Sequence, residues 1–222
     1  MKLNSKYSGL NIAEAGALEL DCYEDKLIFG KHGNVSVKAK YTVLNLSDFD
    51  QGSFAIYETT VNAGIAEKLT VTAKYSTLEF QSVIEADFPD VYETKVTCNF
   101  IGKMGAVSKY STFRFSYLET SLVMNDSYED NIFIERLSSK FKNVYLASKY
   151  SDLDIAFEPG SLYKIDADLT YTSLEYPSEN FREIRYHKDG EKFLYQGVIK
   201  GANETTSSVV TLKMYEGSAE LR

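Results

Sequence analysis

The chain has 222 residues, 44% of them hydrophobic and 25% charged, which excludes a disordered, collagen-like or coiled-coil chain. Its formal net charge of −8 opposes the counterion release that drives nucleic-acid binding, and it gives no attraction to anionic lipid. No apolar run approaches the ~18 residues of a membrane-spanning helix, so we expect neither a nucleic-acid partner nor membrane insertion of this segment.

The residue types favour strands over helices. Seventeen Tyr and 13 Phe with no Trp, only three Pro, and abundant Thr, Ser and Val indicate an all-β protein. Cys22 and Cys98 are the only cysteines, and they lack the CxxC spacing of zinc or redox sites. Both fall on apolar positions of the repeat described next, so we expect them to be reduced and buried.

A repeat of 17 residues begins near residue 3 and sets the expected architecture. We call the residue at the centre of each unit the anchor. The anchors are Tyr7, Glu24, Tyr41, Glu58 and Tyr75 at intervals of 17, followed by Glu93, Tyr110, Glu129, Tyr150 and Tyr171 at intervals that loosen to 21. The residues three and five positions past each of these anchors are apolar, as in Leu10 and Ile12 or Leu78 and Phe80. This alternation is typical of strands with one buried face.

A 17-residue unit cannot bury its own apolar face, so it has to stack on its neighbours. The sequence therefore predicts a right-handed parallel β-helix, or β-solenoid, of ~17-residue coils, roughly eleven to twelve in number at the usual strand spacing. An antiparallel meander, in which each unit is a hairpin, is the alternative.

Charge favours a 17-residue coil over a 34-residue one. A 34-residue coil would stack Lys6 directly on Lys40 and Glu24 on Glu58, and opposed like charges destabilise a sheet. A 17-residue coil alternates lysine with tyrosine in one column, so that each ammonium can lie on a phenol ring. Burial of unpaired glutamates is unfavourable, so we place the anchors at an exposed corner. The column supplies the candidate binding residues Lys40, Tyr57, Lys74, Tyr92, Lys109, Tyr128 and Lys149.

The two ends of the repeat differ. No polar cap precedes it, and because an uncapped solenoid end is an open sheet edge, we expect further residues upstream in the natural protein. The solenoid repeats are predicted over residues 1–176. A hairpin around Asp189-Gly190 makes 177–209 an excursion or cap, and 210–222 restores the pattern as final repeat-like strands of the same domain.

No residue set in the chain indicates a reaction. His32 occupies a repeat position and His187 flanks the predicted turn, so packing and turn solvation explain both better than catalysis does. The scattered His and Cys residues make no zinc set, and no acidic segment has the spacing of a calcium loop. We therefore expect a non-enzymatic protein with no catalytic residue, metal or cofactor.

The repeated unit, as in Ser148–Ile155 and Ser108–Phe115, resembles the adhesin-like β-helix domain family of Bacteroidetes. The resemblance covers residues 3 to about 176, with a weak return at 210–222. It implies an extracytoplasmic module, at the cell surface or in the periplasm, that binds glycans or surface proteins or acts as a spacer. A polysaccharide-acting β-helix enzyme and a cytoplasmic scaffold of the bactofilin kind remain the alternatives.

Overall fold

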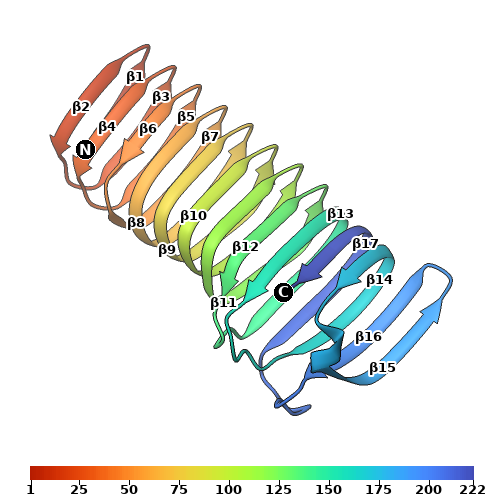
Figure 1. Cartoon of the computed structure of the whole chain (residues 1–222). Coiled ribbons are helices and arrows are strands. Elements are labelled where there is room, and N and C mark those ends of the chain that lie inside the picture. The colour runs from red at the N-terminus through yellow and green to blue at the C-terminus, as the bar shows by residue number, and fades with distance from the viewer.

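The computed structural model describes residues 1–222 as an elongated stack of strands with a single short 3-10 helix (Figure 1). The strands are β1 (Lys2–Lys6), β2 (Gly9–Glu14), β3 (Leu18–Tyr23), β4 (Lys26–Lys31), β5 (Val35–Lys40), β6 (Val43–Leu46), β7 (Phe49–Tyr57), β8 (Thr60–Lys74), β9 (Thr77–Tyr92), β10 (Lys95–Lys109), β11 (Thr112–Tyr128), β12 (Asn131–Leu137), β13 (Asn143–Phe157), β14 (Lys164–Glu175), β15 (Phe181–Asp189), β16 (Lys192–Ile199) and β17 (Val209–Leu221), and the helix η1 is Ser178–Asn180.

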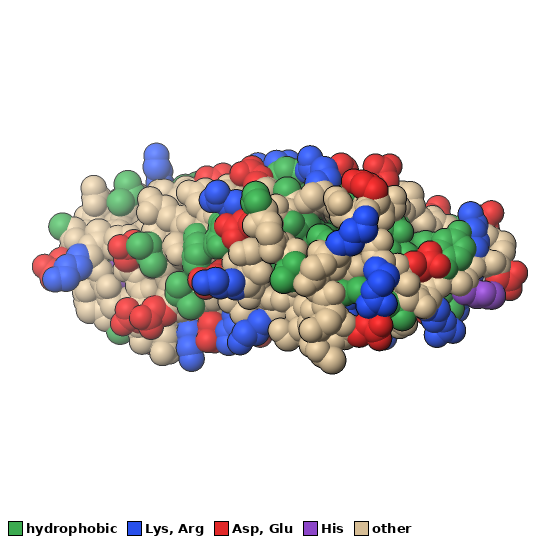
Figure 2. Space-filling view, turned by 60° about the horizontal axis from the view of Figure 1, so that its bottom comes forward, with side chains coloured by type: hydrophobic (Ala, Val, Ile, Leu, Met, Phe, Trp, Pro, Cys, Tyr) green, Lys and Arg blue, Asp and Glu red, His purple; other side chains and the backbone are tan.

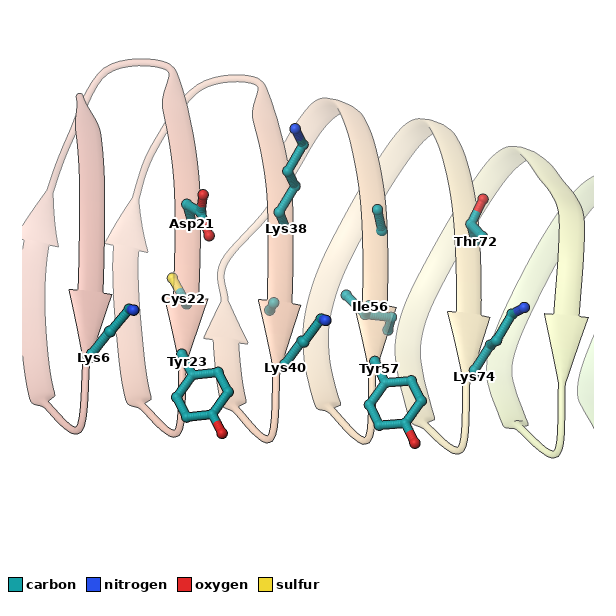
Figure 3. A pocket seen from close by; sticks show the side chains of 12 residues that line it. Lys6, Asp21, Cys22, Tyr23, Lys38, Lys40, Ile56, Tyr57, Thr72 and Lys74 are labelled. Atoms are coloured by element: carbon teal, nitrogen blue, oxygen red, sulfur yellow. The ribbon is translucent and has the colours of Figure 1, made fainter.

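Successive coils lie parallel and in register, which confirms the β-solenoid and rules out the antiparallel meander. In β1 and β3, Lys2 pairs with Glu19, and in β3 and β5, Leu18 pairs with Val35. The continuous winding makes about nine turns of about 18 residues. In Figure 3 the nearer strands run downwards and the return strands rise behind them as the chain advances to the right, which is a right-handed winding.

The core is a set of apolar columns that run along the stack. One cluster of 54 buried hydrophobic residues extends from Leu18 to Leu221. Leu27, Leu44 and Val61 lie directly above one another in this core, three positions past their anchors, and each is at most 1% exposed. The predicted inward positions are therefore confirmed in the interior rungs. In the first rung Leu10 is 37% exposed, because only one neighbouring coil covers it.

The anchors form the sharp corner of every coil. All ten predicted anchors, together with Glu216, have positive φ, between 43° and 60°. We call each corner with its two flanking strand arms a rung, and number the rungs in stacking order. Their corners are, from rung 1 to rung 11, Tyr7, Glu24, Tyr41, Glu58, Tyr75, Glu93, Tyr110, Glu129, Tyr150, Glu216 and Tyr171.

The stacking order departs from the chain order at the C-terminal end. Residues 210–222 were expected to follow the hairpin as the last rung, but β17 lies between β13 and β14 and is parallel to both. Ile155 pairs with Leu221 on one edge of β17, and Lys164 pairs with Val209 on the other. In Figure 1 the C-terminus accordingly lies beside β13, whereas β15 and β16 occupy the far tip.

The expected hairpin is present and covers one arm of rung 11. β15 and β16 are antiparallel around Gly190, which has a φ of 56°, and β16 pairs antiparallel with β14 from Lys164 to Thr170. Beneath the hairpin, six aromatic rings close the end of the core, and we call them the aromatic plug. They are Phe141, Phe157, Tyr163, Tyr176, Phe181 and Tyr195.

Candidate functional site

The corner is held in a conformation that L-residues disfavour. A positive φ of this kind costs a non-glycine residue about 1–2 kcal/mol. Backbone hydrogen bonds between rungs offset that cost: the Tyr41 amide donates to the Tyr57 carbonyl at 3.1 Å, and the Glu58 amide donates to the Lys74 carbonyl at 2.9 Å. The corner is therefore rigid, because each turn is fixed by the rung that follows it.

A buried column of hydroxyl and carboxylate side chains lies directly after the corner. The Thr42 amide donates to the Thr59 hydroxyl at 3.4 Å, and that hydroxyl donates back to the Tyr57 carbonyl at 2.9 Å. The same pattern passes through Ser76 and Thr94. This column satisfies the backbone amide groups that the sharp turn would otherwise leave buried without a partner.

Two rungs have an aspartate in place of the hydroxyl. Asp130 accepts hydrogen bonds from the Ser108 hydroxyl at 2.5 Å, the Ser127 hydroxyl at 2.6 Å and the Ser111 amide at 2.8 Å. Asp25 is held in the same way, by the Ser5 hydroxyl at 3.1 Å and by two backbone amides. Burial raises the pKa of Asp130, and the hydrogen bonds to its carboxylate counteract part of that shift.

Outside the corner, eleven tyrosines form one continuous column, which we call the tyrosine ladder. Each neighbouring pair packs edge to face, with ring centroids 5.3–5.9 Å apart and interplanar angles of 70–85°. Such pairs contribute about 0.5–1.5 kcal/mol each beyond the area that they bury. In order, the ladder is Tyr7, Tyr23, Tyr41, Tyr57, Tyr75, Tyr92, Tyr110, Tyr128, Tyr150, Tyr215 and Tyr171.

The ladder arises from two alternating dipeptides. In odd rungs from 1 to 9 the first arm and the corner meet in the dipeptide Lys-Tyr, as in Lys40-Tyr41. In even rungs they meet in Tyr-Glu, as in Tyr57-Glu58. The ring therefore comes from the corner in one rung and from the preceding strand position in the next. This alternation places a phenol on every rung and keeps two lysines or two glutamates from stacking directly on each other.

The seven candidate binding residues lie in one column, as predicted. Lys40 pairs with Tyr23 on one side and Tyr57 on the other, and the column continues from Lys74 to Lys149. The expected contacts between lysine ammonium groups and phenol rings are not what the structure shows. Its cation–π contacts are elsewhere, at Arg114–Phe133, Arg136–Tyr117 and Lys213–Tyr145, because the ladder rings pack against one another instead.

The sequence interpretation missed the corner tyrosines as part of this surface. Tyr41, Tyr75 and Tyr110 were interpreted only as anchors, yet each is more than 40% exposed and contacts a strand tyrosine on either side. The signal that could have revealed them was the alternation itself, since one tyrosine occurs at one of two adjacent positions in every unit.

The first rungs form a shallow groove of about 570 Å³ beside the ladder. Figure 3 shows Lys6, Lys40 and Lys74 on alternate strands along it, with Tyr23 and Tyr57 on the strands between them. Of these lysines, Lys74 is 3.6 Å from Asp90, whereas Lys6 and Lys40 form no ion pair. Three of the predicted binding residues line this groove, and the other four continue the same column beyond it.

The glutamates at even corners raise the pKa of the neighbouring phenols. Hydrogen bonding to Glu58 and Glu93 is the largest cause that raises the pKa of Tyr57 and Tyr92, respectively, and desolvation adds to it. For Tyr23 and Tyr128 desolvation is the larger cause, and the adjacent glutamate again raises the pKa. Figure 2 shows both signs of charge interspersed along the rod, without a broad patch of either sign on the face in view.

The histidines and Cys98 lie away from this surface, whereas Cys22 lines the groove next to Tyr23. His32 is buried, with its ring 5.9 Å from that of Phe49, and His187 is exposed in β15 beside the hairpin turn. Cys22 and Cys98 are free and buried, as predicted, and burial raises the pKa of each thiol to about 12. Neither thiol is therefore ionised near neutral pH.

Comparison with known proteins yields no match for the chain among family models, curated proteins or solved structures. The structure contains no helix with the length and hydropathy of a membrane span.

Proposed function

We propose that this protein is a non-enzymatic extracytoplasmic rod that presents the tyrosine ladder as a contact surface for glycans or surface proteins. The observation that carries the proposal is the ladder's continuity: eleven rings follow one corner through every rung of the solenoid. Buried apolar columns form the core inside the coils, and the rings lie outside this core, where the corner tyrosines are exposed to a partner.

The rigidity of the ladder favours binding. Each ring except the two at the ends of the ladder is held between two others, and corner amides such as those of Tyr41 and Glu58 are hydrogen-bonded to the next rung. Little conformational freedom therefore remains to be lost when a partner docks, and tyrosine combines an apolar ring with a hydroxyl that can hydrogen-bond. These properties suit a sugar ring or an aromatic-rich protein surface.

The charges beside the ladder favour a partner without a large net charge. Five lysines stand next to the corner on odd rungs and five glutamates form the even corners, so their formal charges cancel. The lysines are Lys6, Lys40, Lys74, Lys109 and Lys149, and the glutamates are Glu24, Glu58, Glu93, Glu129 and Glu216. A polyanion attracted by the lysine column would meet the glutamates one rung away. Neutral glycans are therefore the preferred class within this proposal.

Binding of the full chain to an array of defined β-linked oligosaccharides, neutral, N-acetylated and uronic, tests the proposal. We expect neutral chains to bind above background, and a Tyr75→Ala, Tyr110→Ala variant to lose at least tenfold in affinity while its circular dichroism is retained. A matched control, Ile65→Ala with Ile84→Ala, removes two exposed apolar side chains away from the ladder and should bind as the unmodified protein does. Equal binding by both variants, or none by the unmodified protein, would refute a glycan-binding ladder.

A further inference from the structure

The C-terminal strand β17 is an interior rung although it is the last strand of the chain. It pairs with β13 from Val209 to Leu221 and with β14 from Val209 to Glu220, so both of its edges are hydrogen-bonded. Residues 200–208, which are mostly exposed and polar, connect it to the hairpin. Every other rung interior to the stack is joined directly to the rung before it, so β17 alone enters the stack from outside the winding.

We call the space between β13 and β14 that β17 fills the slot, and its neighbours restrict which side chains fit there. Val210 and Leu212 point inward between apolar side chains of β13 and β14, and Met214 points inward between Ser148 and Leu169. Tyr215 completes the ladder, with its ring centroid 5.9 Å from that of Tyr150 and 5.8 Å from that of Tyr171.

The position directly after the Glu216 corner requires a glycine. Gly217 has a φ of 145°, and a Cβ at this position would collide with the Ser151 carbonyl oxygen. The slot therefore accepts alternating apolar residues followed by Tyr-Glu-Gly, and β17 has that pattern.

The chain segment that links rungs 9 and 11 has the length of a link between directly stacked rungs. The interval from Tyr150 to Tyr171 is 21 residues, the same as the interval from Glu129 to Tyr150, whose rungs do stack directly. The chain through β14 can therefore continue the winding without β17. Direct stacking would place Tyr150 on Tyr171, two corner tyrosines in succession, and would break the alternation of the ladder. Insertion of β17 restores the alternation, so the entry of this strand is an event separate from the winding.

We propose that the slot between β13 and β14 is a strand-binding site that can take β17 from a second copy of this chain. In a reciprocal exchange each β17 would make the same backbone pairs and the same ladder contacts as it does within its own chain. Only the path of residues 200–208 would differ, so protein concentration and the conformation of this connection would decide between monomer and exchanged dimer.

Cleavage of the connection in the full chain tests whether the strand can be replaced. A protease recognition sequence inserted after Thr205 is cut once the protein has folded, and a fluorescent peptide with the sequence of residues 203–222 is then added in excess. We expect the cleaved protein to keep its circular dichroism and to exchange its strand for the peptide. The same peptide with Gly217→Val should bind at least tenfold more weakly, because its side chain meets the Ser151 carbonyl. Global unfolding on cleavage, or equal uptake of both peptides, would overturn the proposal.

Intact copies test the exchange between chains. Two differently tagged full-length proteins are mixed at high concentration, warmed to just below the unfolding transition and cooled. We expect the two tags to co-purify in a dimer whose yield rises when residues 201–207 are deleted, since a two-residue connection hinders return to the slot of the same chain. If the peptide exchanges but neither the full-length nor the shortened chain forms mixed dimers, the second-copy assignment is wrong. Neither result depends on whether the ladder binds glycans.

Discussion

The two end rungs of the solenoid differ in how far other elements cover them. At the N-terminal end, β1 pairs only with β3 and β2 only with β4, and Tyr7 and Leu10 are 71% and 37% exposed. At the C-terminal end, an antiparallel hairpin covers one arm of rung 11, and the aromatic plug closes the core. In a repeat protein each rung is stabilised by its neighbours, so an end rung with a single neighbour is expected to open first unless another element covers it.

The outermost strand at the C-terminal end, β15, is also protected against pairing with another sheet. In β15 every residue after Phe181 is exposed, and Arg182, Glu183, Arg185 and Lys188 place charges along its free edge. Charged side chains on an edge strand oppose pairing with another sheet. The strands at the N-terminal end are less protected in this respect, since β2 has Gly9, Leu10, Asn11, Ile12 and Ala13 before its first charged residue. The comparison therefore predicts that a destabilising substitution near rung 1 affects only that end, whereas one near rung 10 also destabilises the neighbouring rungs.

Leucines in the two regions should differ most in their effect on stability. Leu212 of β17 is fully buried between Leu146 and Ala167, whereas Leu10 of β2 contacts the column only through Leu27. We expect Leu212→Ala to lower the free energy of unfolding by about 2–5 kcal/mol and Leu10→Ala by less than about 1 kcal/mol. Urea unfolding measures both losses. In hydrogen exchange the amides of β14 to β16 should lose protection with Leu212→Ala, and equal losses for the two variants would contradict the comparison.

The two buried aspartates offer a second contrast, of intermediate size. Asp130→Ala leaves the Ser111 amide and two buried hydroxyls without their acceptor, so we expect a loss of about 1–3 kcal/mol in urea unfolding. Asp25→Ala, one rung from the open end, should lose less, because rung 1 can open and let water replace the carboxylate. The reverse order would show that the N-terminal rung is as firmly held as the interior.

Asp130 should also give the protein a pH dependence of definite sign. Burial raises its pKa in the folded protein, so its contribution to stability is fully present below its ordinary pKa and is lost as pH rises through the raised value. Compared with an Asp130→Asn variant, the unmodified protein should therefore gain stability as the pH falls from neutral towards 4. Unfolding midpoints of both proteins across that range check the difference, and a constant gap between them would exclude the effect.

Thiol labelling compares an end with the interior in the unmodified protein. Cys22 lies in rung 2 and Cys98 in the middle of the stack, and both thiols have a pKa raised to about 12 by burial. Alkylation at mildly alkaline pH therefore requires local opening. We expect Cys22 to react first, by about tenfold for each ~1.4 kcal/mol of difference in opening free energy. Mass spectrometry of the labelled peptides gives the rates, and denatured protein, in which both thiols should react alike, is the control.

The smallest expected effect concerns the corners. Glu24 and Glu129 have nearly the same positive φ, 52° and 51°, in rungs 2 and 8. Asparagine tolerates this conformation better than glutamate, so Glu129→Asn should raise the free energy of unfolding by a few tenths of a kcal/mol, and Glu24→Asn by no more than that. Thermal unfolding of the pair measures the difference. A loss at both corners would indicate that the glutamate carboxylates hold the neighbouring tyrosines in place.

Much of the fold follows from the sequence because the same pattern of apolar and polar positions recurs in every unit of the repeat. Apolar residues three and five positions past each anchor predicted the core columns, and the unfavourable stacking of Lys6 on Lys40 predicted the coil length. The lysine–tyrosine column was likewise predictable, since position in a parallel stack follows from spacing alone. The packing of the rings against one another, in place of the lysines, was not, because it depends on side-chain directions at a corner of unusual φ.

By itself the sequence determined which residues of the interior rungs face inward and which residues form the corner, because these depend on the periodicity of the repeat, and it favoured parallel coils over an antiparallel meander. The tertiary structure alone decided where Val209–Leu221 belongs. Chain order favours placing Tyr171 directly after Tyr150, whereas the alternation of the ladder requires a Tyr-Glu rung between them. Tyr215-Glu216 supplies that rung from 65 residues beyond Tyr150. Contacts at that separation follow from the complementarity of packed surfaces, which no local pattern specifies.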